Sequence, residues 1–366
     1  MSKKIYALKD GVRVLDNGAD EIRLRKGIWN YEEAELDMQG FSDDFKKSFR
    51  TVMDALCEKE GFSSEDVSKF KLSADEEGTV YQVLNQLEAG NYLTDKESRD
   101  LNRDISYAIL GYAMDGSNGE VLENAGGKIL VVSDCDYAKE TAVSMAKVMK
   151  ITADVASDDL YERLSKADLT TKTDGLHTAE NMAAFAKELG EYSVFMACFK
   201  NIPSKLMHNL NRIALECKIP VVVSFIDGPM VSILSYKPYD VGCYECFENR
   251  SLARIQDHVL YHKFEMNARA REGEDNAGII PVMNILANIA ISESYLYLFY
   301  GSSRFEGRLL TIFVPTLEIQ VQDVLRVPFC PACGMVAMEQ LKEKNISTRA
   351  LVDSFVNNII KKELNR

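Results

Sequence analysis

Alternation of apolar and polar residues near the start of the chain predicts a group of short β-strands. The strand-like runs are residues 5–8, 12–15, 22–25 and 28–31. Turn-forming sequences, Lys9-Asp10-Gly11 and Asp16-Asn17-Gly18, separate the first three runs, as expected between antiparallel strands. We therefore expect one small antiparallel sheet at the N-terminus.

Helical periodicity replaces this alternation after residue 40. Residues 41–44 supply an N-cap signal for a first helix, and residues 63–66 begin a shorter one. A third helix opens at residues 73–76, ends at Gly90 and is followed by an extended segment at 92–93. Strands, three helices and a terminal extended segment predict a winged helix-turn-helix domain over residues 1–95, followed by a helical linker over 96–125.

From residue 126 onward, apolar runs alternate with amphipathic helices. The expected strands are residues 128–133, 151–155, 192–198 and 219–225, and the expected helices are 138–149 and 204–217. Continuous apolar strands alternating with helices are typical of a doubly wound α/β domain, which we assign to residues 126–366. Residues 282–299 form a long apolar helix that packs either in the core or against a second copy of the chain.

Two Cys-x-x-Cys clips are the sharpest chemical signal in the sequence. Cys243 and Cys246 form the first clip, and Cys330 and Cys333 form the second, about 80 residues further along. Four thiolates in two short clips predict a closed, structural Zn²⁺ site without an open position for water. Two disulfides or two redox dithiols are the alternatives. The other four cysteines are expected to be buried free thiols.

The first strand-to-helix turn of the α/β domain lacks the glycines that a nucleotide phosphate requires. It reads Ser133-Asp134-Cys135-Asp136-Tyr137-Ala138. Side chains there crowd the approach to the backbone amides, and two carboxylates oppose a pyrophosphate. We therefore expect no nucleotide cofactor at this turn.

Charge excludes several classes of partner. The chain has 366 residues, a net charge of −13 and a pI near 5.0, which disfavours nucleic acid because phosphate binding needs clustered Lys and Arg. The N-terminus lacks a secretory signal, and no segment has the uninterrupted apolar length of a membrane span. The chain is therefore predicted to be cytoplasmic.

The last helix of the predicted winged domain is acidic, which favours a peptide over DNA as its partner. Residues 74–89 contain four carboxylates and no Lys or Arg. In the peptide-binding mode, an extended segment adds to the edge of the small sheet and enters the cleft beside this helix. The predicted contacts, from the second and third strands and the last helix, are Trp29, Tyr31, Tyr81 and Leu84.

Several runs of the α/β domain resemble a known superfamily. Residues 209–222, NLNRIALECKIPVV, are similar to the helix-to-strand passage of ThiF/MoeB-type, ubiquitin-activating-enzyme-like proteins. Residues 227–233 with the first clip, and residues 329–334 with the second, resemble the next strand and the paired zinc clips of that superfamily. The resemblance covers roughly residues 126–340.

With a winged N-terminal domain, the chain resembles the cyclodehydratase partner proteins of thiazole/oxazole-modified peptide biosynthesis, including streptolysin-type bacteriocin systems. That resemblance implies recognition of the leader segment of a ribosomally made precursor peptide and activation of a separate, ATP-using YcaO-type cyclodehydratase. An FMN-dependent dehydrogenase and a homodimer within a larger complex are also implied. No catalytic residue is expected in this chain, whose length leaves no room for a YcaO domain.

Two other functions remain open. An active ThiF/MoeB-like enzyme would adenylate a carboxylate with ATP, and Asp158 and Arg212 would then stand near the expected ribose-binding acid and a basic position. Their alternatives are a helix N-cap and a solvated charge. A winged-helix DNA-binding regulator is the third hypothesis.

Overall fold

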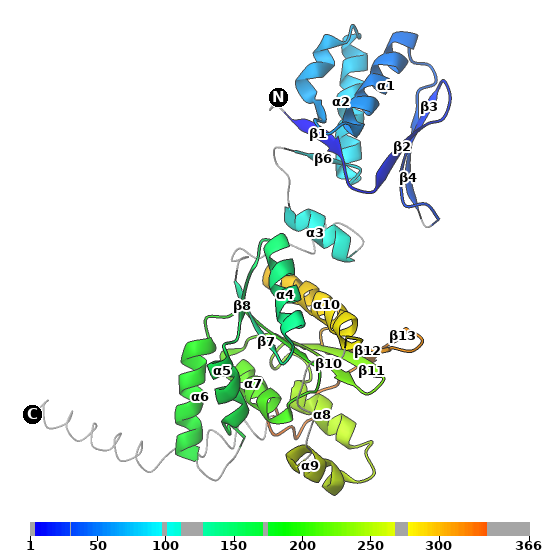
Figure 1. Cartoon of the computed structure of the whole chain (residues 1–366). Helices are drawn as coiled ribbons and strands as arrows, with labels where there is room; N and C mark the ends of the chain where they lie inside the picture. Colours follow the sequence, from blue (N-terminus) through cyan, green and yellow to red (C-terminus); the bar gives the residue numbers. More distant parts are fainter. Residues whose placement is uncertain are drawn as a thin grey trace, which may run out of the picture. The chain divides into compact units, whose positions relative to one another are not determined.

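The computed structural model describes residues 4–29, 31–96, 101–110, 127–170, 175–267 and 277–334. The chain divides into two compact units, Met1–Met114 and Asp115–Arg366; both are drawn in Figure 1. Each unit has its own sheets and core. Of the predicted linker, residues 101–110 are described and form a helix of the first unit, whereas residues 111–125 lie outside the described part.

The strands of the first unit form two sheets, so the expectation of a single sheet was wrong. In one sheet β1 (Ile5–Leu8) lies between β5 (Phe62–Ser63) and β6 (Leu93–Asp95), antiparallel to both. The other sheet has the order β2-β3-β4, with bounds Val12–Asp16, Glu21–Lys26 and Glu32–Asp37. β1 does not pair with β2, because its ladder partners β5 and β6 come from distant segments that flank the helices.

Strand β4 was not predicted. Its sequence, EEAELD, is acidic, and the described residues of the expected run 28–31, which are Ile28, Trp29 and Tyr31, precede this strand and form none of their own. Ala34 and Leu36 pair with Leu24 and Ile22 and share their core face, whereas Glu33 and Glu35 lie opposite Arg25 and Arg23. This alternation of period two was the available signal, which the acidic composition obscured.

The predicted helices of the first unit are present. They are α1 (Asp43–Cys57), the short 3₁₀ helix η1 (Ser64–Lys69), α2 (Ala74–Ala89) and α3 (Leu101–Leu110). Ser42 Oγ accepts the N–H of Phe45 at 3.1 Å and caps α1, and Ser73 with Glu76 forms a capping box at α2. Phe45, Phe49, Leu84 and Leu87 are among the buried residues that pack these helices on Ile22 and Leu24 of β3.

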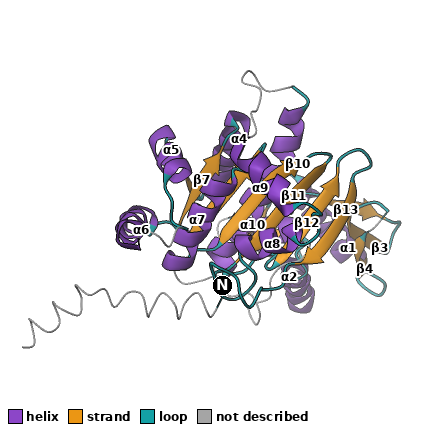
Figure 2. Cartoon of the chain, turned by 90° about the horizontal axis from the view of Figure 1, so that it is seen from below, coloured by secondary structure: helices purple, strands orange, loops and turns teal. Residues whose placement is uncertain are grey.

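The second unit is built on a seven-stranded mixed sheet with the order β13-β12-β11-β10-β9-β7-β8 (Figure 2). The strands are β7 (Lys128–Ser133), β8 (Thr152–Val155), β9 (Val194–Phe199), β10 (Val221–Asp227), β11 (Met230–Tyr236), β12 (Arg308–Phe313) and β13 (Glu318–Asp323). The half from β8 to β10 is parallel, as expected for α/β winding. The half from β10 to β13 is antiparallel, because a tight hairpin at Gly228 returns the chain directly beside β10.

Helices cover both faces of this sheet. On one face lie α4 (Asp136–Val148) and α10 (Ile279–Tyr300), which contact each other. On the other, α5 (Asp158–Lys166), α6 (Gly175–Leu189) and α7 (Ser204–Cys217) contribute buried side chains to one core cluster with the strands. The remaining helices are α8 (Tyr244–Leu252) and α9 (His258–Asn267).

Helix α10 is long and apolar enough to cross a membrane by length and composition, with a mean hydropathy of 1.4 over its best window. The sequence predicts this helix over residues 282–299, but Asn284, Asn288 and Glu293 interrupt its apolar residues, so it did not meet the criterion of an uninterrupted apolar run for a membrane span. Half of that window is buried inside the unit, and the helix contacts α4, β9 and β10. Glu293 is fully buried and accepts hydrogen bonds from the Arg304 backbone N–H at 2.8 Å and from Nε at 2.6 Å. These contacts are those of a core helix.

Candidate functional site

The four clip cysteines form one cluster. Cys243, Cys246, Cys330 and Cys333 are each at most 1% exposed, and their Sγ atoms all lie within 4.8 Å of one another. The Sγ–Sγ distance is 3.9 Å within the first clip, and the two clips approach to 3.7 Å (Cys243–Cys330) and 3.4 Å (Cys246–Cys333). A tetrahedral zinc with Zn–S bonds of about 2.3 Å spaces its sulfurs by about 3.8 Å. The donor set therefore fits a metal site with four cysteine ligands.

These distances disfavour the two alternatives to a shared metal, which are two disulfides or two separate redox dithiols. A disulfide needs an S–S distance of about 2.05 Å, and all eight cysteines, which lie in the described part of the chain, are free. Contacts between the clips are as short as the contact inside the first clip, so the clips do not form two separate dithiols. The arrangement favours one ion held by all four sulfurs.

Hydrogen bonds to sulfur support the thiolate form. The backbone N–H of Val327 donates to Cys246 Sγ at 3.3 Å, and Asn211 Nδ2 donates to Cys243 Sγ at 3.7 Å. Such donors orient the ligands of a metal and balance their charge.

Close backbone approach explains the glycines beside both clips. A Cβ on Gly242 would lie 2.6 Å from the carbonyl oxygen of Val324, and a Cβ on Gly334 would lie 2.5 Å from that of Cys330. A larger residue at position 242 would push away the segment that leads to the second clip, and one at position 334 would distort the turn of the second clip itself. These glycines therefore hold the sulfurs at ligand distance.

A buried polar network from α7 and β11 braces the first clip. Glu245, inside that clip and 4% exposed, receives two hydrogen bonds from the guanidinium of Arg212, at 2.7 and 2.9 Å. Asn211 Nδ2 donates to Glu245 Oε1 at 3.2 Å, and the Tyr236 hydroxyl donates to Asn211 Oδ1 at 2.9 Å. The Arg212 side chain is 15% exposed and paired with Glu245, so it is not a solvated charge.

At the turn after β7, the carboxylate of Asp134 accepts hydrogen bonds from backbone N–H groups of the loop that follows β9. Asp134 Oδ1 accepts the N–H of Lys200 at 2.8 Å, and Oδ2 accepts that of Asn201 at 3.4 Å. Both amides follow β9, at the strand ends where α/β folds bind anionic ligands. Burial raises the pKa of Asp134. Asp158 is the first residue of α5, and the helix is capped by Ser157, whose Oγ accepts the N–H of Leu160 at 3.2 Å.

The predicted peptide contacts lie in different environments. Trp29 is 94% exposed and Tyr31 is 48% exposed, both in the turn between β3 and β4, and the Arg25 guanidinium lies 4.0 Å from the Tyr31 ring centroid. The Tyr81 hydroxyl donates to the carbonyl oxygen of Ser64 at 2.9 Å. Leu84 has no exposed surface and belongs to the core, so it offers no direct contact. Trp29 and Tyr31 are the accessible pair.

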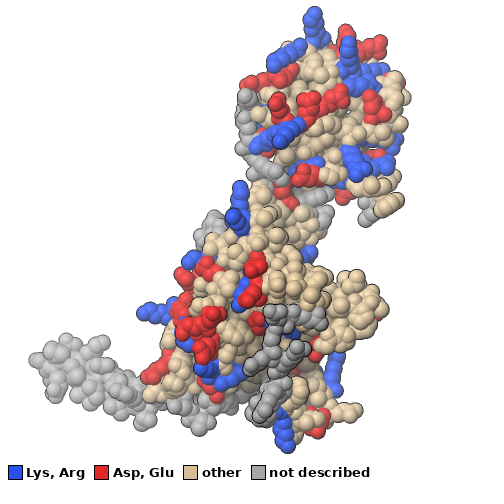
Figure 3. Space-filling model, viewed as in Figure 1, with Lys and Arg blue, Asp and Glu red and all other residues tan. Residues whose placement is uncertain are grey.

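Charges of both signs are interspersed over the face of the first unit that Figure 3 shows. Arg23 and Arg25 of β3 are paired with Glu33 of β4, at 3.2 and 2.8 Å. Such cross-strand pairs neutralise the cations that a phosphate backbone would need.

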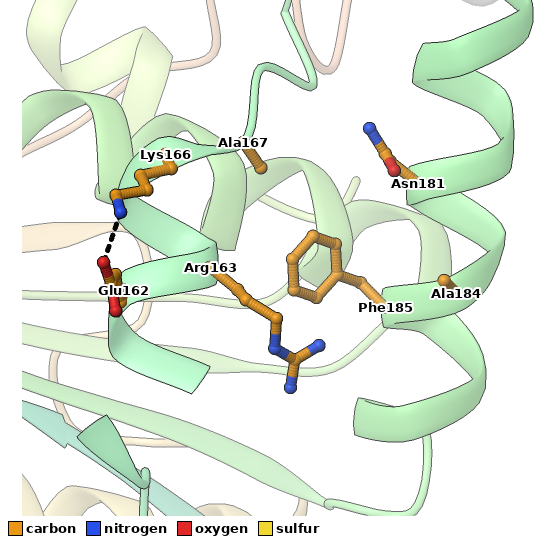
Figure 4. A pocket seen from close by; sticks show the side chains of 7 residues that line it. All are labelled: Glu162, Arg163, Lys166, Ala167, Asn181, Ala184 and Phe185. Carbon is orange, nitrogen blue, oxygen red and sulfur yellow. Dashed lines mark hydrogen bonds and ion pairs between the residues drawn. The ribbon is translucent and has the colours of Figure 1, made fainter. Parts of the chain in front are cut away.

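A groove of about 500 Å³ lies between α5 and α6 (Figure 4). Arg163 and Phe185 point into it, and the guanidinium is 5.6 Å from the ring centroid. Arg163 also makes two hydrogen bonds to Glu188, at 2.6 and 2.9 Å, and Lys166 pairs with Glu162. These charged groups already satisfy one another, so the groove offers little chemistry.

No protein-family model and no curated protein sequence matches this chain. Among solved structures, the chain is similar to a heterocyclase in complex with substrate and cofactor, with a TM-score of 0.58, 13% identity, and coverage of 90% of this chain and 40% of that chain. It is similar to the heterocyclase TruD with a TM-score of 0.58, 16% identity, and coverage of 90% and 43%. The chain thus spans about two fifths of the length of these heterocyclases.

E. coli MccB is a third structural relative, in crystals with ATP and with MccA-N7isoASN. The TM-score is 0.50 and the identity 12% in both cases, over 90% of this chain and 99% or 100% of MccB. Identities this low establish the fold alone. The chain therefore shares its fold with two heterocyclases and with MccB.

Proposed function

We propose that this chain is the leader-peptide-binding partner subunit of an ATP-dependent, azoline-forming cyclodehydratase. The observation that carries the proposal is the fold shared with heterocyclases over 90% of this chain but only 40–43% of theirs. A part of that size is suited to hold the substrate while a YcaO-type catalyst performs the chemistry. One heterocyclase was crystallised with its substrate and MccB with MccA-N7isoASN, which supports a peptide partner.

We propose that the first unit is a winged helix-turn-helix domain and that it contains the peptide-binding site. Among the residues that the structure describes, strand β4 pairs with β3 on one side only, so its other edge presents backbone groups without a ladder partner to an extended peptide. Trp29 and Tyr31 precede this edge and are exposed, so they are the proposed side-chain contacts. The edge strand is β4 rather than the second or third strand expected from the sequence.

The second unit then has a structural and activating role. The cluster of four cysteines is proposed to hold a structural Zn²⁺ that ties the first clip to the second. Asp134 is proposed to take the place of a bound anion at the strand ends, because its carboxylate accepts the Lys200 and Asn201 amides. In cyclodehydration a Cys, Ser or Thr side chain attacks the preceding amide carbonyl, and the catalyst uses ATP to activate the amide oxygen. This chain would only bind and present the peptide, within a complex that includes a second copy and an FMN-dependent dehydrogenase.

Binding of the precursor peptide without ATP tests the proposal. The probe is the precursor peptide that the proposal requires, which is to be identified as a short open reading frame with a Cys/Ser/Thr-rich tail beside a YcaO gene. Calorimetry should show binding of its leader, and amide hydrogen exchange should slow in Glu32–Asp37. A scrambled leader is the peptide control. The proposal fails if the leader does not bind.

Variants test the proposed contacts. Trp29→Ala should weaken leader binding about tenfold, since a buried aromatic contact commonly contributes more than about 1 kcal/mol. Leu15→Ala is the matched control, because Leu15 is 55% exposed on β2, the opposite edge of the same sheet. Equal effects of the two substitutions would place the peptide elsewhere.

An ATP-dependent adenylating enzyme is the second candidate, favoured by the likeness to MccB crystallised with ATP. It predicts tight ATP binding and exchange of labelled pyrophosphate into ATP. Tight ATP binding together with pyrophosphate exchange would replace the partner-subunit proposal, whereas peptide binding without exchange would support it.

A further inference from the structure

A second cavity lies within the first unit, away from the β4 edge. It has a volume of about 710 Å³, and its lining includes residues of β1, β2, the end of α1, the segment from Asn91 to Lys96, and α3. Ala7, Leu8, Val12 and Leu56 give it an apolar part. One lining residue, Lys26, pairs with Glu32 of β4, and no residue of β4 itself lines the cavity.

Lysines are the most numerous charged residues of this cavity. Its lining contains four lysines, Lys9, Lys26, Lys59 and Lys96, and three carboxylates, Asp10, Glu58 and Asp104. Lys9 pairs with Asp104 at 2.8 Å, and Lys26 pairs with Glu32, outside the lining, at 3.2 Å. Lys59 and Lys96 are therefore the ammonium groups that can attract an anionic group.

Two lysines meet at the turn that forms one wall. Lys9 Nζ donates to Asn91 Oδ1 and, at 2.8 Å, to Asp104 Oδ1. Lys26 Nζ donates to the carbonyl oxygen of Gly90 at 3.0 Å and lies 4.1 Å from the ring centroid of Tyr92. These contacts hold the turn from Gly90 to Tyr92 in one conformation, in which Asn91 has a φ of 63°.

Asn91 has an unused donor in this wall. The residue is 5% exposed, and Nδ2 has no hydrogen-bond partner among the described residues. The bond from Lys9 to Oδ1 fixes which end of the amide is the donor, because an ammonium group cannot accept. Buried unpaired donors are costly and uncommon, so an acceptor oxygen from a ligand would remove that cost.

From these observations we infer that this cavity binds a carboxylate carried on an apolar stem, as in an acidic residue or the C-terminus of a peptide. The Asn91 amide donates to the carboxylate, Lys59 and Lys96 balance its charge, and Ala7, Leu8, Val12 and Leu56 contact the stem. This site is separate from β4, so it can exist whether or not leader binding occurs there.

The test uses the whole chain and three small probes: N-acetyl-Leu-Glu-amide, its neutral counterpart N-acetyl-Leu-Gln-amide, and N-acetyl-Leu-Leu with a free C-terminus. Binding is followed through the side-chain amide resonances of ¹⁵N-asparagine, with that of Asn91 assigned from Asn91→Gly. At least one carboxylate probe should shift the Asn91 signal and bind at least about tenfold more tightly than the Gln probe. The two carboxylate probes distinguish a side chain from a C-terminus.

Variants give the matched controls. Asn91→Gly keeps the positive φ and removes the amide, and Lys96→Met removes one cavity charge, so each should weaken binding about tenfold, as measured by calorimetry. Lys71→Met, an exposed lysine outside the cavity lining, should have no effect. Equal affinity for the Gln probe, binding that survives Asn91→Gly, no shift with any probe, or binding of inorganic phosphate alone would each overturn the inference. Leader binding at β4 has a different readout, so failure of either can be recognised separately.

Discussion

Removing the side chain of Asn211 should test whether the polar network braces the cysteine cluster. Asn211 is fully buried in α7 and contacts three groups: the Tyr236 hydroxyl on β11, Glu245 in the first clip, and Cys243. Asn211→Ala removes all three contacts at once without changing a cysteine. It therefore separates the support of the clip from the sulfurs themselves.

The expected cost follows from the groups left without partners. The Tyr236 hydroxyl, fully buried, loses its acceptor, which costs about 1–3 kcal/mol. The carboxylate of Glu245 loses one donor but keeps Arg212, and a hydrogen bond to a charged group contributes about 1.5–3 kcal/mol. We expect Asn211→Ala to lower the free energy of unfolding of the second unit by about 3–5 kcal/mol.

A double-mutant cycle makes this reasoning specific. Tyr236→Phe removes the hydroxyl, so the combined variant no longer buries it unpaired and should be more stable than the sum of the single effects predicts, by about 1–2 kcal/mol. Urea unfolding followed by far-ultraviolet circular dichroism measures these values. Asn288→Ala on the exposed side of α10 is the control and should change stability by less than about 0.5 kcal/mol. Strict additivity, or a cost of Asn211→Ala below about 1 kcal/mol, would refute the bracing role.

Two further predictions concern the cluster and the turn after β7. Cys330→Ser should reduce bound zinc from one ion per chain to none and unfold the second unit, because metal-binding free energy is folding free energy in such clips. Metal analysis and thermal melting measure the two effects, and Cys57→Ser, at an exposed cysteine, is the control. An unchanged melting temperature of Cys330→Ser would contradict the prediction. Burial raises the pKa of Asp134 above its ordinary 3.8, so its contribution to stability is present at acid pH and is lost as the pH rises through the folded-state pKa. Asp134→Asn has no carboxyl group to titrate and should not lose this stability. The urea midpoint of the original chain should therefore fall relative to that of the variant as the pH rises from 3.8. A difference between the two midpoints that stays constant with pH would contradict the raised pKa of Asp134.

Elements with strong local signals were predicted closely. Helix α7 and strand β7 have the predicted bounds, and helix α2 begins within residues 73–76 as predicted, with a capping box formed by Ser73 and Glu76. Periodicity and capping depend on residues within one or two turns, so the sequence contains all the information they need. The clips were likewise identified from local spacing.

Long-range pairing was the part that the sequence could not supply. Whether β1 joins β2 or the distant β5 and β6, and whether the large sheet turns antiparallel after β10, depends on contacts between segments far apart in the chain. Strand β4 was missed because four carboxylates hid its two inward apolar residues. Such choices are decided by burial and ladder partners, which a local pattern does not reveal.

The sequence by itself determined that two pairs of cysteines, spaced for one metal, lie in an α/β chain without a glycine-rich nucleotide loop. Only the tertiary structure brought the pairs together across 87 residues, placed Arg212 and Asn211 against the first clip, and left one edge of β4 open. Ligand spacing within a clip is a property of neighbouring residues. The distance between clips, the support of the site and the accessible edge arise from packing, which only the folded chain defines.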